Sequence, residues 1–145
     1  MALYTIGDLH LSLSDDRTMD RFGDNWKDHV KKLEKNWRRM IRPEDTTVLT
    51  GDHSWGRKLA GCEADLQFII RLPGRKILLR GNHDMFWDAK KTDRLNEQFA
   101  GKLSFLQNNY YTYGNYALVG TKGYCFEGRD SLEHFGIIRD RELER

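Results

Sequence analysis

The first hundred residues alternate between short apolar segments and longer segments with helical periodicity. Three apolar runs are β-branched or rich in leucine, and each is followed by glycine; they cover residues 3–6, 46–50 and 76–80. Such short runs bounded by glycine are typical of strands buried inside a sheet. We therefore predict three strands, each ending where a glycine lets the backbone turn sharply.

Helical periodicity fills the intervals between these strands. Apolar residues recur at spacings of three and four over residues 26–41 and 59–72, and more weakly over residues 90–100. This spacing places the apolar side chains of each segment on one face of a helix. Alternation of strands and helices predicts an α/β fold in which helices cover a parallel sheet.

Beyond residue 100 the pattern changes to shorter, closely spaced strands. Residues 103–107, 110–113 and 116–120 have strand character, and Gly114–Asn115 suits a hairpin turn between the last two. No stretch rich in Gly, Ser and Pro divides the chain. We therefore expect residues 1–145 to belong to a single domain.

Composition narrows the class of protein. The chain has 145 residues, of which 39% are hydrophobic and 32% charged, and this balance excludes collagen-like and disordered classes. No apolar run reaches the roughly 18 residues of a membrane helix, and the first residues do not resemble a signal peptide. Cys62 and Cys125 lie far apart, which excludes a disulfide framework and a Cys-based zinc site. We expect a cytoplasmic protein with no membrane partner.

The charge is small overall but uneven. The net charge is +2, yet Lys and Arg outnumber Asp and Glu by nine to four between Arg17 and Arg42. Such a stretch attracts phosphate-bearing ligands. Recognition of nucleic acid also needs exposed aromatic rings, whereas Trp26 and Trp37 fall on the apolar face of the predicted helix. We therefore disfavour a nucleic-acid partner.

Polar side chains follow each of the three predicted strands directly. They are Asp8, His10, Asp52, Asn82, His83 and Asp84. Ligands of open parallel sheets bind outside the carboxyl ends of the strands, so we expect these six side chains to converge on one site.

This residue set suits a pair of divalent cations. Carboxylate, imidazole and amide oxygen ligands favour Mn, Fe or Zn, and two such ions commonly form the clamp for phosphoester hydrolysis. Asp8 and His10 alternate along an extended chain and suit one ion, Asp52 suits a bridging position, and Asn82 suits a second ion. His83 is then placed to protonate a leaving oxygen, and Asp84 to accept a hydrogen bond that fixes the tautomer of His83.

The remaining histidines and aromatic residues near these motifs favour structural interpretations. We expect His29 to lie on the surface of the charged helix, and His53 to have a structural or pocket-wall role. Trp55 fits the core better than a pocket wall.

The strand-end motifs resemble those of a known family. Gly7–His10, Gly51–Asp52 and Gly81–Asp84 are similar to the first three motifs of the calcineurin-like metallophosphoesterases, and Leu72–Lys76 resembles a bacterial branch of predicted phosphohydrolases. The resemblance implies an α/β/β/α sandwich with a dinuclear metal centre. It also implies that Asp8, His10, Asp52 and Asn82 bind the metals, and that the catalytic residues His83 and Asp84 assist the phosphoryl group.

The family has later motifs, a single His and a Gly-His-x-His, which complete both metal shells. His134 is the only histidine after His83, and it does not fit them. We therefore expect the N-terminal part of the sandwich, truncated at the C-terminus, with an exposed sheet edge that favours a homo-oligomer.

Two functions are consistent with these patterns. The first is a metal-dependent phosphoesterase that activates water for attack on a phosphate mono- or diester, in a small molecule or a nucleotide. The alternative is a catalytically impaired module that binds metal or phosphate, which the missing histidine motifs favour.

Overall fold

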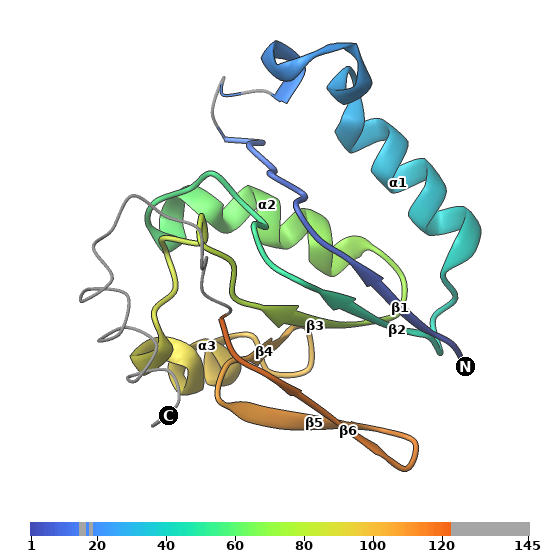
Figure 1. Cartoon of the computed structure of the whole chain (residues 1–145), viewed down its shortest axis with the longest axis vertical. Coiled ribbons are helices and arrows are strands. Elements are labelled where there is room, and N and C mark those ends of the chain that lie inside the picture. Colours follow the sequence, from blue (N-terminus) through green and yellow to red (C-terminus); the bar gives the residue numbers. More distant parts are fainter. Residues whose placement is uncertain (15–16, 18, 123–145) are drawn as a thin grey trace, which may run out of the picture.

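The computed structural model describes residues 1–14, 17 and 19–122. Its centre is a parallel sheet with strand order β1-β2-β3-β4 (Figure 1). The strands are β1 (Leu3–Ile6), β2 (Thr46–Leu49), β3 (Arg75–Leu79) and β4 (Ser104–Leu106). All three pairings are parallel, which confirms the predicted sheet. The predicted strand at residues 103–107 joins it as β4.

Helices and a hairpin lie on either side of the sheet. The helices are α1 (His29–Met40), α2 (Leu59–Arg71) and α3 (Thr92–Gln98), and the short 3-10 helices are η1 (Met19–Phe22), η2 (Asp24–Trp26) and η3 (Ala89–Lys91). Strands β5 (Asn109–Tyr113) and β6 (Tyr116–Gly120) form an antiparallel hairpin, as predicted. Figure 1 shows α1 and α2 above the sheet and the hairpin below it.

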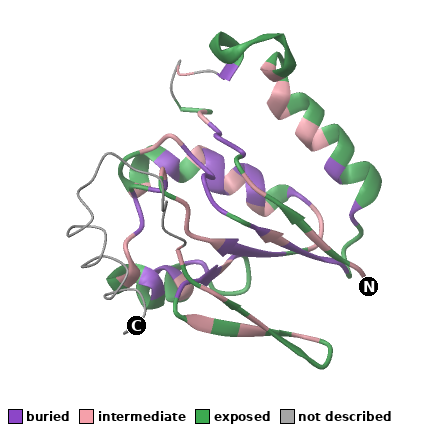
Figure 2. Ribbon diagram, viewed as in Figure 1, coloured by how far each residue is buried: buried purple, intermediate pink, exposed green. Residues whose placement is uncertain are grey.

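The core lies between α2 and the sheet. Cys62, Leu66 and Ile69 of α2 are 0% exposed, and so is Leu78 of β3. Helix α1 contributes much less, and only Trp37 among its residues is buried (Figure 2). The indole N–H of Trp37 donates to the carbonyl of Pro73 at 3.0 Å, which ties α1 to the turn before β3.

The first helix begins later than its apolar spacing predicts. Asp28 has a φ of 55°, a left-handed conformation that interrupts a right-handed helix. Trp26 therefore lies in η2 and is half-buried rather than buried. The prediction that Trp26 belongs to the apolar face of α1 was wrong.

Strand β1 forms one edge of the sheet. Its residues Leu3 and Ile6 are 42% and 36% exposed. No helix in the described part of the chain is long and apolar enough to cross a membrane. Cys125 and His134, discussed above, lie outside the described residues.

Candidate metal centre

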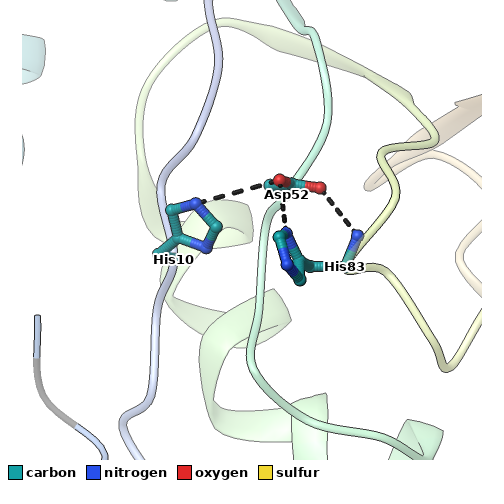
Figure 3. A group of neighbouring side chains, drawn as sticks. All are labelled: His10, Asp52 and His83. Carbon is teal, nitrogen blue, oxygen red and sulfur yellow. Dashed lines mark hydrogen bonds and ion pairs between the residues drawn. The ribbon is translucent and has the colours of Figure 1, made fainter. Parts of the chain in front are cut away.

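The loops that follow β1, β2 and β3 bring His10, Asp52 and His83 together (Figure 3). One potential ligand atom of each lies within 4.8 Å of the others. His83 Nδ1 is 2.8 Å from Asp52 Oδ2, and His10 Nε2 is 3.8 Å from the same oxygen. The Asp52 carboxylate therefore stands between two imidazole rings, an arrangement that suits borderline divalent cations.

Asp8 and Asn82 lie at the two ends of this group. Asp8 Oδ1 is 3.5 Å from His10 Nε2, and its side chain is 72% exposed. The exposed Asn82 side chain has its Nδ2 3.2 Å from His83 Nδ1. The structure thus brings five of the six predicted side chains into one cluster at the carboxyl ends of the strands.

The backbone of these loops is unusual at the candidate ligands themselves. Asp8, His10 and Asp52 have φ values of 55°, 44° and 55°, a region that side chains other than glycine rarely adopt. The amide hydrogens of Asp8 and His10 extend the β1–β2 ladder past the strands: Asp8 N donates to Gly51 O at 3.0 Å, and His10 N donates to Asp52 O at 2.9 Å. Backbone strain of this kind clusters at functional sites.

Glycine is required where β2 and β3 end. Gly51 has a φ of 116°, and a Cβ at this position would lie 2.7 Å from Gly81 Cα. A Cβ on Gly81 would clash in turn with the backbone nitrogen and carboxylate of Asp52. The two glycines therefore let the loops that carry Asp52 and His83 approach each other directly.

Asp84 has a different role from the predicted one. Its Oδ2 accepts hydrogen bonds from the backbone N–H groups of Asp52 (2.9 Å) and Gly81 (2.8 Å), and its Oδ1 accepts one from His53 N (2.8 Å). Asp84 is completely buried. The carboxylate that accepts from the His83 ring is Asp52. Asp84 instead fixes the backbone that presents Asp52.

The pKa of Asp52 reflects opposing influences. Burial raises it, but hydrogen bonds from the ring and the backbone N–H of His83 lower it more, so that the pKa lies below its ordinary value. Asp52 is therefore ionised at neutral pH. An ionised, 6% exposed carboxylate between two imidazoles fits a bound cation, because buried charges need a compensating partner.

Aromatic rings enclose the imidazoles. Trp55 stacks on His10 with a centroid distance of 5.0 Å and lies 5.2 Å from His83. It is half-buried, so it lines the site rather than the core, contrary to the prediction. Trp26 contacts His10 edge-on at 6.4 Å.

The other two histidines of this region have structural contacts. His29, which was predicted to lie on the surface, is half-buried, and its Nε2 lies 3.2 Å from the carbonyl of Leu9. His53 is 0% exposed, and its Nε2 lies 3.0 Å from the carbonyl of Leu79. The predicted structural role of His53 agrees with this position.

A buried hydrogen-bond network, which the sequence patterns did not indicate, holds the loops that follow β1 and β2. Asp65 on α2 is 1% exposed. Its Oδ1 accepts from Leu13 N at 2.8 Å, and its Oδ2 accepts from Ser54 Oγ at 2.5 Å. Leu13 follows His10 and Ser54 follows Asp52. An acidic residue on the apolar face of a predicted helix is the one signal that points to this tie.

Comparison with known proteins agrees with the motifs and the fold. A protein from Mycobacterium phage D29, named Gene 66 protein, is 38% identical over 72 residues, which are 47% of this chain and 36% of the phage protein. The match thus spans about a third of that relative. The crystal structure of a protein of unknown function from Aquifex aeolicus shares the fold, with a TM-score of 0.56 and 20% identity over 99% of this chain and 72% of that one. The sequence model of the calcineurin-like phosphoesterases (Metallophos) matches residues 1–145, and the chain therefore belongs to this family.

Proposed function

We propose that the protein is a metal-dependent phosphoesterase whose centre is built on Asp8, His10, Asp52 and Asn82. One observation carries this proposal: His10, Asp52 and His83, from three separate strand ends, present ligand atoms within 4.8 Å of one another. The donor set fits Mn, Fe or Zn. When bound, two such ions supply an activated water and neutralise the charge on the phosphoryl oxygens.

In this proposal Asp8 and His10 would hold the first ion, Asn82 would hold the second, and Asp52 would be a ligand of both. The Trp55 ring fixes the plane of His10 by stacking on it. Each carboxylate or imidazole reaches the site from a loop whose backbone is already fixed, so little conformational entropy is lost when substrate binds.

His83 is the proposed general acid. Its Nδ1 is bonded to Asp52 at 2.8 Å, which fixes the ring and leaves Nε2 as the nitrogen that exchanges a proton with substrate. The side chain is 41% exposed, as a group that contacts a leaving oxygen must be. The proposed substrates are phosphate mono- or diesters.

Hydrolysis of p-nitrophenyl phosphate and bis-p-nitrophenyl phosphate tests the proposal. We expect hydrolysis that depends on added Mn, Fe or Zn and falls about 100-fold or more in Asp52→Asn, because loss of a bridging carboxylate removes a ligand from both ions. Asp93→Asn, which changes an exposed carboxylate on α3, is the matched control. Equal activity in chelator-treated protein would contradict the proposal.

A second function is favoured by the small size of the cluster. Within the described residues, the His, Cys, Asp and Glu side chains that group together are His10, Asp52 and His83. Two fully coordinated ions need more ligands than these three side chains provide. This favours a module that binds metal or phosphate without turnover. Calorimetric binding of Mn with no hydrolysis of either ester would support that module instead of the enzyme.

A further inference from the structure

A pocket with a basic lining adjoins the candidate metal centre. This basic pocket is lined by Arg57, Lys58, Met85, Phe86, Lys91 and Arg94, together with parts of α2 and α3, and it has a volume of about 290 Å³. That volume is near the lower end of the roughly 300–1,000 Å³ found for small-ligand sites. Four of its lining residues are cations, and none of them is acidic.

The loops that carry Asp52 and His83 also form the walls of the basic pocket. Met85 is two residues beyond His83, and Met85 N donates to His83 O at 2.8 Å in a tight turn. Arg57 is two residues beyond Trp55, whose ring stacks on His10 and contacts His83 at a tilt. Two residues span at most about 7 Å between Cα atoms. Met85 and Arg57 in the pocket wall therefore lie within about 7 Å, between Cα atoms, of His83 and Trp55 at the metal centre.

The cations of the basic pocket are largely uncompensated. Lys91 pairs with Asp88 at 3.1 Å. Arg57, Lys58 and Arg94 are exposed, and among residues 1–14, 17 and 19–122 no ion pair joins them to a carboxylate. Like charges gathered around a concave surface raise the local positive potential and attract anions. Arg in particular forms bidentate hydrogen bonds with phosphate.

The apolar wall of the basic pocket and the start of α2 strengthen its preference for anions. Phe86 and Leu95 line it and are only 4% and 3% exposed, so one side of the pocket is a dry apolar surface. Helix α2 begins beside it at Leu59, with no side-chain cap and no acidic residue in its first turn. The dipole of α2 at this N-terminal end adds to the positive potential of the lining cations.

We propose that the basic pocket binds a second phosphate group of the substrate, beyond the one at the metal centre. The substrate class is then a compound with several phosphates, such as a polyphosphate chain or a nucleotide that carries one. Its assignment as a substrate subsite rests on the proposed function, whereas the binding of phosphate there does not.

Inorganic tripolyphosphate is the probe for binding. We would titrate it by calorimetry into the full chain in chelator, without metal, so that the metal centre makes no contribution. We expect the dissociation constant to rise about tenfold or more in Arg57→Glu/Arg94→Glu, because two attractive charges become repulsive. Lys35→Glu/Arg39→Glu makes the same change in net charge on exposed positions of α1, and we expect little effect from it.

Equal weakening in both double variants, or no binding by the unmodified protein at millimolar probe, would overturn the proposal. If the charge reversal prevents folding, Arg57→Gln/Arg94→Gln removes the two positive charges without adding negative ones, and we expect a smaller rise of the dissociation constant in the same direction.

A kinetic experiment separates the two proposals. We expect the pocket variant to raise KM for a substrate with several phosphates and to leave KM for p-nitrophenyl phosphate unchanged. Tripolyphosphate binding that is sensitive to Arg57 and Arg94, in a protein that hydrolyses neither ester, would uphold the phosphate site and reject the enzymatic function.

Discussion

At the scale of single residues, two buried carboxylates outside the metal cluster organise the candidate centre. Asp84 accepts three backbone N–H groups from the loops that hold Asp52 and His83. Asp65 accepts from Leu13 and Ser54 and so ties α2 to the loops after β1 and β2. By accepting these hydrogen bonds, each carboxylate removes the free-energy cost of burying unpaired backbone or hydroxyl donors.

The pKa of Asp65 predicts how the stability of the folded protein changes with pH. Burial raises its pKa, and this outweighs the lowering by hydrogen bonds from Ser54 and Leu13. The folded protein therefore holds the Asp65 proton more tightly than the unfolded chain, whose pKa is about 3.9. The stabilisation is complete below that unfolded pKa and is lost as the pH rises through the folded pKa.

We expect the free energy of unfolding of the unmodified protein, minus that of Asp65→Asn, to decrease as the pH rises from about 4. Urea unfolding at a series of pH values measures it, and the subtraction cancels the other carboxyl groups. A difference that grows with pH over this range would show that the Asp65 carboxylate is stabilised rather than destabilised by its surroundings.

The sequence predicts the position of a site residue where that residue directly follows a strand. His10, Asp52 and His83 could be placed together because the ends of parallel strands share one edge. The partners of Asp84, Asp65 and Trp55 could not be placed in this way. Their contacts join loops that lie far apart in the chain, and neither periodicity nor local spacing records such contacts.

At the scale of elements, two glycines at the ends of the parallel strands β2 and β3 determine how closely the loops that follow can approach each other. Gly51 and Gly81 lie in backbone contact there. The strands themselves agree closely with their apolar runs, since β1 covers the predicted residues 3–6 and β2 ends one residue early. The start of α1 was mispredicted because apolar spacing carries no signal for the left-handed backbone of Asp28.

Gly51→Ala measures this close approach. Gly23 is the matched control, because its φ of 124° is similar to the 116° of Gly51 but a Cβ there would meet nothing within 4 Å. Both substitutions strain the backbone, and only Gly51→Ala also forces β2 and β3 apart. We expect it to lower the free energy of unfolding by about 1–3 kcal/mol more than Gly23→Ala. Equal losses in urea unfolding would show that the loops separate without cost.

At the scale of the whole molecule, the candidate centre is where the separate strand-end loops meet. Asp8 and His10 follow β1, Asp52 follows β2, and Asn82 follows β3. A cation held by these side chains would therefore link the edge strand β1, whose Leu3 and Ile6 are exposed, to the centre of the sheet. Such a link stabilises the folded protein in proportion to how tightly the ion binds, because the unfolded chain does not hold the site together.

We therefore expect Mn, Fe or Zn to raise the melting temperature. At a free metal concentration 100 times the dissociation constant, the gain is about 2.7 kcal/mol, or roughly 5–10 °C for a chain of this size. Asp52→Asn should lose most of the rise, whereas Asp93→Asn should keep it, and differential scanning calorimetry measures both. A rise of the same size in Asp52→Asn would place the bound ion elsewhere, since no other carboxylate in the described chain stands between His10 and His83.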